Sequence, residues 1–448
     1  MKRRIILVDL PWRDQGDERP SLGHASLLAS LRTQKLLDVH PVVQVVSDSF
    51  SSTDFLAKRI LEAIGQSTHD NADVAIGAFI WNERVVQELT GALRHRGFNG
   101  RIVLGGPQIT YAGTGLETMY PGVDVFIRGQ AESALCKLAA VSGRPKICGI
   151  HYAGDVDLCE QASTPILAAP SPWLSNPGSL ARSAQINWET QRGCHFRCSF
   201  CQHRQPDSRT PVVKADSDRT DREIDLFCQA DVARISVLDP VFNQDQNHAL
   251  RIMRKFITRG FEGELSFQCR AEMINAEFLD VAQQLNVCLE FGLQSIHKRE
   301  YLAVGRPNNM GKVEAALREV VRRQIPHEVS LIYGLPEQTI HTFKESVDWC
   351  KKIEVEIIKA YPLLMLRGTE LEKNRDKWSL KVAEDDLQIV IGSNSFDLED
   401  WQAMNHIASS LSFLNNPKSG RLREFEKDAP LRQAHLAGAR CLALGKTR

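Results

Sequence analysis

Short apolar runs alternate with helix-patterned segments along two long stretches of this sequence, and this alternation restricts the possible folds more than any other feature. Strand, helix, strand at this spacing predicts parallel sheets covered by helices, which is the α/β class. In the first stretch the predicted strands are Ile5–Leu10, Val42–Val46, Val74–Phe79, Ile102–Leu104 and Val123–Ile127. In the second stretch they are Ile186–Trp188, Ile235–Leu238, Leu265–Cys269, Cys288–Gly292, Glu328–Tyr333 and Glu356–Tyr361.

The same pattern divides the chain into domains. Residues 1–140 predict a Rossmann-like, doubly wound parallel sheet. The range 141–183 is predicted to be a linker, because a Pro/Ser/Gly-rich connector occupies 168–179. Residues 184–371 resume the alternation and predict either a second open sheet or a partial barrel; on either scaffold ligands bind at the carboxyl ends of the strands. Residues 372–448 are mostly helical and polar in pattern, as in a C-terminal cap.

Composition excludes several classes of protein. The 448 residues suffice for two or three domains. Lys plus Arg and Asp plus Glu both number 55, so the net charge of zero argues against general nucleic-acid binding. No apolar run approaches the roughly 20 residues of a membrane-spanning helix. The basic, then apolar start stops at Asp9, too early for a signal peptide. We therefore expect a cytoplasmic protein.

Three of the eleven cysteines, Cys194, Cys198 and Cys201, cluster directly after the first strand of the second domain. Three thiolates within eight residues can wrap one small cluster, and thiolates are the ligands that iron–sulfur clusters prefer. Structural zinc sites and electron-transfer clusters usually take four ligands. Three ligands on a four-iron cluster leave one iron open, which predicts that this iron binds another molecule.

A zinc site completed by His195 or His203 is the alternative for these cysteines. Zinc pairs usually read Cys-x2-Cys followed by a second pair farther along the chain, and no second pair exists here. The scattered positions of the other eight cysteines argue against a disulfide framework.

The Cys-x3-Cys-x2-Cys spacing resembles the radical S-adenosylmethionine (SAM) superfamily. The resemblance implies a partial (β/α)6 barrel and a [4Fe–4S] cluster on Cys194, Cys198 and Cys201 whose open iron binds SAM. One electron from the cluster would cleave SAM to methionine and a 5′-deoxyadenosyl radical. Phe200 stands where the family has an aromatic residue whose backbone touches the adenine.

Four later segments are similar to the family in the same order, so the resemblance covers roughly residues 185–371. The segment 332–339, Ile-Tyr-Gly-Leu-Pro-Glu-Gln-Thr, resembles the "G-L-P-x-x-T" motif. Tyr333 within it could face the active site and pass a hydrogen atom or proton, or could be a strand residue packed against a helix. The other segments imply cofactor contacts at Asp239, Arg270, Gln294 and Ser295.

The first domain lacks G-x-G-x-x-G after its first strand, so an ordinary dinucleotide site is not expected. Its fourth strand instead ends in paired glycines, which let a backbone approach a bulky ligand or simply make a tight turn. Together with the segments 77–82 and 121–132, this resembles the cobalamin-binding domain of one radical SAM subfamily. The resemblance implies cofactor contacts at Trp81, Asn82, Gly105, Gly106, Pro107 and Gly129.

Two features differ from cobalamin proteins: the Asp-x-His-x-x-Gly motif of mutases is absent, and Gly-Gln-Ala-Glu at 129–132 replaces the usual Gly-Glu-Gly-Glu. The resemblance as a whole implies a cobalamin-dependent radical SAM methyltransferase. Such an enzyme methylates an unactivated carbon of a small molecule or peptide. It takes its electron from a donor such as flavodoxin or ferredoxin.

Two other functions stay open. A radical SAM enzyme without methyl transfer would be an epimerase, dehydratase, cyclase or rearrangement enzyme whose first domain does not use cobalamin. A non-enzymatic iron–sulfur or zinc protein would not cleave SAM.

Overall fold

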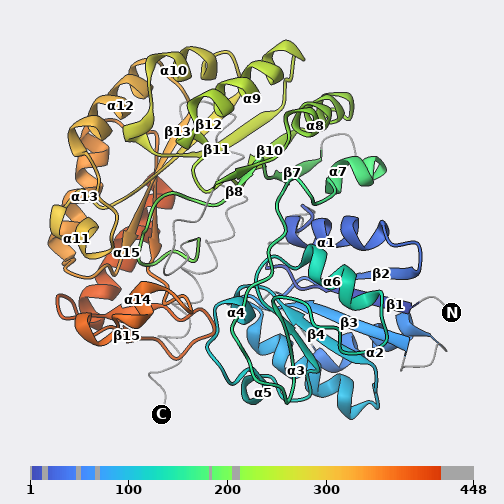
Figure 1. The fold of residues 1–448 in the computed structure, drawn as a ribbon. Coiled ribbons are helices and arrows are strands. Elements are labelled where there is room, and N and C mark those ends of the chain that lie inside the picture. The colour runs from blue at the N-terminus through green and yellow to red at the C-terminus, as the bar shows by residue number, and fades with distance from the viewer. Residues whose placement is uncertain are drawn as a thin grey trace. The chain divides into compact units, whose positions relative to one another are not determined.

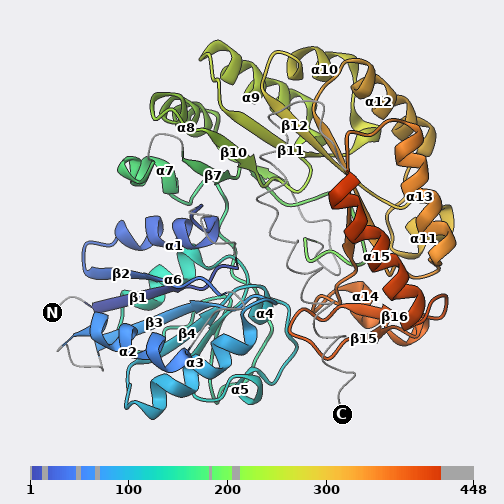
Figure 2. The ribbon, with the colours of Figure 1, turned by 180° about the vertical axis from the view of Figure 1, so that it is seen from behind.

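The structure is a computed structural model that describes residues 3–12, 19–46, 52–65, 71–180, 184–203 and 212–414. The chain divides into two compact units, Met1–Ser179 and Leu180–Arg448. Figures 1 and 2 show both units from opposite sides. Each unit is described by itself below.

The first unit contains a six-stranded sheet in the order β2-β1-β3-β4-β5-β6. The first five strands are parallel and β6 is antiparallel to β5. Their order reverses direction between β1 and β3, which confirms the predicted doubly wound fold. The strands are β1 (Arg3–Asp9), β2 (Leu37–Val43), β3 (Ala72–Gly77), β4 (Arg101–Gly105), β5 (Val125–Ile127) and β6 (Ile150–Tyr152).

Helices cover both faces of this sheet (Figure 1). Residues of α1 (Leu22–Arg32) and α6 (Ala131–Ala139) join one hydrophobic core, and residues of α2 (Thr53–Ile64) and α3 (Glu83–His95) join the other. The predicted strand at 42–46 begins earlier in the structure, at Leu37. This edge strand alternates exposed polar and apolar residues, so only its end looks like an apolar run.

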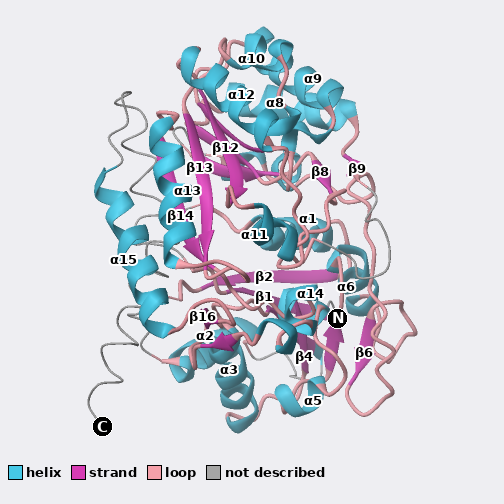
Figure 3. Ribbon diagram, turned by 90° about the vertical axis from the view of Figure 1, so that its left-hand side faces the viewer, coloured by secondary structure: helices cyan, strands magenta, loops and turns pink. Residues whose placement is uncertain are grey.

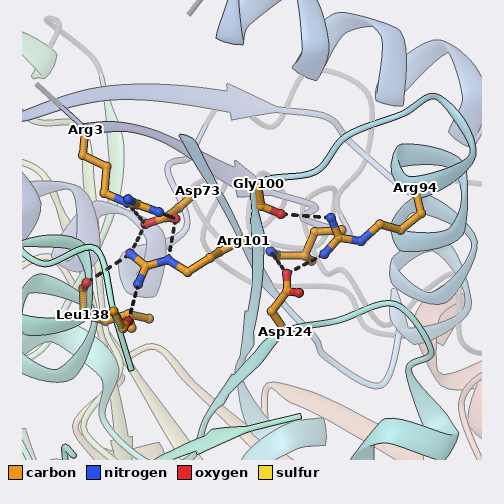
Figure 4. A network of polar contacts seen from close by, with 9 residues as sticks. Arg3, Asp73, Arg94, Gly100, Arg101, Asp124 and Leu138 are labelled. Carbon is orange, nitrogen blue, oxygen red and sulfur yellow. Dashed lines mark hydrogen bonds and ion pairs between the residues drawn. The ribbon is translucent and has the colours of Figure 1, made fainter. Parts of the chain in front are cut away.

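The amino ends of β1, β3 and β4 are tied together by a buried ion network (Figure 4). Asp73 is 1% exposed and accepts hydrogen bonds from Nε of Arg3 at 2.9 Å and Nε of Arg101 at 2.8 Å. A buried carboxylate is tolerated because two guanidinium groups pair with it. Close by, Arg94 pairs with Asp124. This edge of the sheet is therefore structural.

Much of the range predicted as a linker packs on the first unit. β6 extends its sheet, and Ala162 forms a bridge with Gly129 at the end of β5. Two short helical segments, α7 (Pro172–Ser175) and a 3-10 turn at Pro177–Ser179, precede the division between the units.

The second unit contains six parallel strands in the order β14-β13-β12-β11-β10-β7. Each strand of this sheet pairs with the strand of the same sheet that follows it along the chain. The crossovers therefore all run the same way, and the helices lie on one side of the sheet (Figure 1). This arrangement is a partial (β/α)6 barrel and excludes a second doubly wound sheet. The strands are β7 (Gln185–Trp188), β10 (Arg234–Val237), β11 (Glu264–Cys269), β12 (Val287–Gln294), β13 (His327–Tyr333) and β14 (Ile357–Pro362).

The helices on the outer side begin mostly at side-chain caps. Asp216, Asp245, Asn275, Asn309 and Thr339 each accept a hydrogen bond from the first turn of the helix that follows. These helices are α8 (Ser217–Gln229), α9 (Gln246–Thr258), α10 (Ala276–Ala282), α12 (Met310–Arg322) and α13 (Ile340–Lys352); α11 (Lys298–Ala303) follows β12.

The region after the barrel strands contains a hairpin as well as helices. α14 (Glu370–Lys373) is followed by β15 (Lys381–Val382), which pairs with β16 (Val390–Gly392). α15 (Leu398–Leu414) lies against β14 (Figure 3). Trp401 and Met404 of α15 are buried. Residues 415–448 of the predicted cap lie outside the described residues.

None of the helices in the described part of the chain combines the length and the apolar composition needed to cross a membrane.

Candidate functional site

The turn between β7 and the cysteines is held by a buried carboxylate. Asp239, at the end of β10, accepts hydrogen bonds from the backbone N–H groups of Thr190 at 2.7 Å and Gln191 at 3.1 Å. Gln191 then begins the two-residue strand β8 (Gln191–Arg192), which pairs antiparallel with β9 (Val213–Lys214) beyond the cysteine loop. The sequence predicted a cofactor contact for Asp239, but the structure gives its carboxylate the role of positioning the loop that carries the cysteines.

A hydroxyl links this carboxylate to a histidine. The Thr190 Oγ1 group donates to Asp239 and lies 2.9 Å from Nε2 of His248. When Asp239 is ionised the hydroxyl proton goes to the carboxylate, and the histidine nitrogen then donates to Thr190. Burial raises the pKa of Asp239 to about 7 and lowers the pKa of His248 to about 4. Both shifts favour the uncharged forms, as expected in a low-dielectric interior.

The cysteine loop is also held from its other side. The Ser199 N–H donates to the Val304 carbonyl at 2.8 Å, and the Ser199 carbonyl accepts from the Leu371 N–H at 2.8 Å. Gly305 has φ +61°, and a Cβ there would lie 2.9 Å from the Arg197 carbonyl. A side chain at this position would therefore push the two loops apart.

The three thiols share a largely buried environment. Cys198 is buried, while Cys194 and Cys201 are half-buried. Burial raises the pKa of Cys201 to about 11 and also raises the pKa of Cys194; the neighbouring thiols add to both shifts. The thiols of Cys194 and Cys201 therefore stay protonated at neutral pH until a cation replaces their protons.

A site for a single ion finds no support in this loop. Within the described ranges, no three His, Cys, Asp or Glu side chains lie close enough together to hold one metal ion. Zinc would need its sulfur and nitrogen ligands within about 2.0–2.3 Å of one point. In a four-iron cluster each thiolate binds a different iron, so the sulfurs lie farther apart than in a site for a single ion.

Two buried arginines lie beside the thiols. Arg270, 2% exposed, follows β11; its guanidinium lies 3.8 Å from the ring centre of Phe196 and pairs with Glu272 at 2.7 Å. Its Nε and Nη1 atoms are buried and have no hydrogen-bond partner among the described residues. Arg306 donates from Nη1 to the Cys198 sulfur at 3.5 Å, and no described residue pairs with its Nε. Unpaired buried guanidinium N–H groups offer binding to an anion such as a carboxylate.

Gln294 and Ser295, two predicted cofactor contacts at the end of β12, have different roles. Gln294 has φ +71°, lies at a bulge of β12, and buries its Oε1 without a partner. Ser295 is fully buried; its hydroxyl donates to Glu300 at 2.6 Å and accepts from the His297 N–H at 2.9 Å. Gln294 thus remains available to a ligand, whereas Ser295 fixes the start of α11.

Glu300 extends this contact to the next strand. Gln338 donates to Glu300 at 3.2 Å and accepts from the N–H groups of Gly334 at 2.7 Å and Leu335 at 3.2 Å. The "G-L-P-x-x-T" segment therefore ties the carboxyl ends of β12 and β13 together.

Tyr333 lies on the helix-covered face of β13. Its hydroxyl donates to Oδ1 of Asn405 at 2.8 Å, and its ring packs 5.8 Å from the rings of Phe343 and Trp401. Burial raises its pKa. Because the side chain is held between β13, α13 and α15, its contacts are those of a packed strand residue, which is the second of the two roles that the sequence allowed.

The opposite face of these strands, away from the helices, is polar. Glu328 pairs with Lys359 at 2.5 Å, and Ser266 donates to Glu290. Burial, followed by the Glu328 carboxylate, raises the pKa of Glu290. Barrel interiors are usually filled with branched apolar side chains. Charged and hydroxyl groups here instead suit a polar ligand.

Sequence reasoning missed Arg306, Glu290 and Gln338. A lone Glu in the apolar run Val287-Cys288-Leu289-Glu290-Phe291 could have indicated a strand position that faces away from the packed side. Nothing in the local pattern distinguishes Arg306 from a surface loop residue. Phe200 is half-buried within the cysteine loop.

The predicted cobalamin contacts gather at the carboxyl edge of the first sheet. Trp81 Nε1 donates to the Leu10 carbonyl at 3.3 Å and Asn82 Nδ2 donates to it at 3.1 Å, which joins the ends of β1 and β3. Asn82 also accepts from the Phe79 N–H, and the Trp81 ring stacks on Phe79 at 4.5 Å. These residues lie where the strand order reverses, which is the usual ligand position of doubly wound sheets.

The glycines of this edge have structural reasons of their own. Gly106 has φ +95°, and a Cβ there would lie 2.6 Å from the Ala78 carbonyl. Pro107 follows it and begins the short helix α4 (Pro107–Thr110). At Gly129 a Cβ would lie 2.3 Å from the Ala162 carbonyl. Gly105 is different, because its Cβ would only touch the Ile127 carbonyl at 3.6 Å.

Orphaned groups at this edge come from other residues. The ring nitrogens Nε1 of Trp12, just after β1, and Nε2 of His24, in the first turn of α1, are buried without partners among the described residues. Burial lowers the pKa of His24. Buried polar atoms without partners are rare and indicate a missing ligand, ion or water. The edge is therefore compatible with a bound cofactor.

Comparison with known proteins finds similarity to one enzyme family. The profile of the Radical SAM superfamily matches residues 188–350. The cobalamin-dependent radical SAM methyltransferase TokK of Streptomyces tokunonensis is 24% identical over 302 residues, which cover 61% of this chain and 44% of TokK. The 2-(S-pantetheinyl)-carbapenam-3-carboxylate methyltransferase of Streptantibioticus cattleyicolor is 25% identical over 214 residues, 43% of this chain and 30% of that enzyme. The chain thus spans less than half the length of these relatives.

A solved structure extends the similarity to both units. The radical S-adenosylmethionine methyltransferase TsrM from Kitasatospora setae, with cobalamin and a [4Fe–4S] cluster bound, has a TM-score of 0.67 at 15% identity, covering 90% of this chain and 81% of TsrM. At this identity the similarity concerns the fold.

Proposed function

Since residues 188–350 belong to the radical SAM superfamily, we propose that the chain is a cobalamin-dependent radical SAM methyltransferase that methylates an unactivated carbon of a small molecule or peptide. Cys194, Cys198 and Cys201 would hold the [4Fe–4S] cluster. When bound, the cluster supplies the electron that cleaves SAM to a 5′-deoxyadenosyl radical, and cobalamin supplies the methyl group. A donor such as flavodoxin or ferredoxin would reduce the cluster.

One observation carries this proposal: two buried guanidinium groups with N–H atoms unpaired among the described residues lie beside three clustered thiols, of which Cys198 is buried and the other two are half-buried. Arg270 and Gln294 would orient the polar groups of SAM, whose carboxylate is the natural partner of a guanidinium. The buried surroundings exclude water, which strengthens these contacts and protects a reactive radical.

The substrate class follows from the polar barrel face. Glu290, Glu328, Lys359 and Ser266 place carboxylates, an ammonium group and a hydroxyl on one surface. Such a surface binds a molecule with several hydrogen-bonding groups better than a lipid chain. We therefore favour a small polar substrate over an apolar one.

The test begins with anaerobic purification after growth with cobalamin. Iron, sulfide and extracted cobalamin are assayed on the same sample, and SAM cleavage is then followed under strong reductant. The proposal expects about four irons and one cobalamin per chain, together with 5′-deoxyadenosine. Formation of products heavier by one methylene unit would then demonstrate the proposed methyl transfer. Zinc in place of iron would refute it.

A radical SAM enzyme that does not transfer methyl groups is the second candidate. It is favoured by the first unit, where Asn82, Gly106 and Gly129 are already engaged by the chain's own backbone. Four irons with SAM cleavage, but without cobalamin even after reconstitution, would support this candidate.

A further inference from the structure

Arg306 is the described side chain that reaches a cysteine sulfur from outside the cysteine loop. It follows α11, is 8% exposed, and donates from Nη1 to the Cys198 sulfur at 3.5 Å. Its Nη2 donates to the Gly292 carbonyl at the end of β12. One planar group thus connects the cysteine loop to a barrel strand, and each contact fixes the orientation of the other.

We propose that Arg306 sets the reduction potential of the iron–sulfur cluster through its hydrogen bond to the Cys198 sulfur. This inference rests on the proposed function, because it requires that the three cysteines hold a cluster. The inference goes beyond the proposed function because it assigns to Arg306 control over how readily the cluster accepts an electron.

The contact is built into the fold and is not a chance approach of a flexible side chain. The residues before Arg306 are locked against the cysteine loop: the Val304 carbonyl accepts from the Ser199 N–H, and Gly305 fits only because it has no Cβ. A Cβ on Gly292 would lie 3.4 Å from Nη2 of Arg306, so that glycine also leaves room for the guanidinium. Backbone on both sides therefore holds the donor in place.

The physical effect has a definite sign. Reduction adds one negative charge to the cluster and its thiolates. A buried cationic donor stabilises the reduced form more than the oxidised form, and hydrogen bonds to the sulfurs are among the factors that set cluster potentials. Burial enlarges the effect, because little water screens the charge. Removing the donor must therefore lower the midpoint potential and make the cluster harder to reduce.

Arg270 and Arg197 provide comparisons. Arg270 is buried too, but its hydrogen bonds go to Pro307, Asn308 and Glu272 and not to a thiol. Arg197 adjoins Cys198 in sequence but its side chain is exposed. A simple dependence on nearby positive charge would make Arg197 as important as Arg306, whereas a directed hydrogen bond would not.

The experiment is an anaerobic redox titration of the reconstituted protein without SAM, with the reduced cluster quantified by electron paramagnetic resonance. Arg306→Gln is expected to shift the midpoint to lower potential by about a tenfold change in the ratio of reduced to oxidised cluster, which is 59 mV for one electron. Arg306→Lys keeps the positive charge but lacks the forked N–H donors of the guanidinium group. It should therefore lower the midpoint potential by less than Arg306→Gln does. Arg197→Gln serves as the matched control and should shift it least.

A wild-type midpoint potential in Arg306→Gln, with iron content unchanged, would overturn the inference. A shift in Arg197→Gln as large as that in Arg306→Gln would overturn it too. If Arg306→Gln binds no iron, Arg306→Lys decides: a lower midpoint supports the inference and a wild-type midpoint overturns it. Failure of the proposed function is a separate result, because the wild-type chain itself would then bind no four-iron cluster.

Discussion

The predicted site residues at the carboxyl edges of the two sheets satisfy their polar groups in opposite ways. In the first unit, Asn82 has its partners within the unit, and Gly106 and Gly129 pack directly on the backbone of neighbouring segments. In the second unit, Arg270 and Gln294 keep buried atoms without partners. An unpaired buried polar atom costs about 1–3 kcal/mol. A ligand that paired with these atoms of the second edge would therefore remove this free-energy cost.

This difference teaches that two kinds of cofactor site leave different traces in a sequence. The cysteine loop is short and chemically marked, so its three cysteines lie on one motif and Arg270 lies on another, although Arg306 lies on none. On the first edge the unpartnered groups are Trp12 and His24, which no motif indicated. A large flat cofactor is held mainly by shape and by many weak contacts, which leave little pattern in a sequence.

The largest expected effect is at the cluster. Cys198→Ala removes one of three ligands and the acceptor of Arg306, so we expect iron to fall to background and SAM cleavage to disappear. Cys228→Ala is the matched control, since Cys228 is a half-buried cysteine of α8 outside the cluster loop. Iron and sulfide assays after anaerobic reconstitution measure both. Full iron in Cys198→Ala would remove the basis of the contrast between the two edges.

The next effect concerns the unpaired guanidinium. Arg270→Gln should weaken SAM binding about 10- to 100-fold, because hydrogen bonds to charged groups contribute about 1.5–3 kcal/mol. Equilibrium dialysis with SAM on the cluster-loaded protein measures the change. Arg259→Gln, which loses only an exposed pair with Asp225, should bind SAM as the wild type does. Equal affinities in both variants would show that the unpaired atoms of Arg270 have another cause.

Sequence reasoning predicted the strands of the second unit well, for a physical reason. Buried parallel strands read as apolar runs, and the cluster assignment of the three cysteines stays a prediction. Sequence reasoning could not predict that Tyr333 faces the helices, because a strand residue alternates between two faces and no local signal says which face is the interior. Nor could it separate the structural glycines Gly106 and Gly129 from ligand-contacting ones, since the close backbone approach that requires them comes from distant segments.

The first edge can be tested with two neighbouring glycines. Gly106→Ala would force a Cβ to 2.6 Å from the Ala78 carbonyl at φ +95°, so it should lower the melting temperature. Gly105→Ala meets only an ordinary contact at 3.6 Å and should fold normally. If a corrin approaches this backbone, Gly105→Ala should lose cobalamin several-fold while keeping its iron. Unchanged cobalamin in a well-folded Gly105→Ala would exclude close approach at this glycine.

The smallest effect concerns a part of the second edge whose hydrogen bonds are satisfied, the Thr190 hydroxyl between Asp239 and His248. The folded-state pKa of His248, about 4, lies below its usual value, so the unfolded chain binds the extra proton and acidification from pH 7 to 5 destabilises the fold. The folded-state pKa of Asp239, about 7, lies above its usual value, so the same acidification stabilises it. Each contribution is about 2 kcal/mol and the two oppose each other. Asp239→Asn should therefore become less stable between pH 7 and 5, and His248→Gln more stable, each compared with the wild type by anaerobic thermal melting. Parallel pH profiles in all three proteins would mean that neither group titrates as its burial requires.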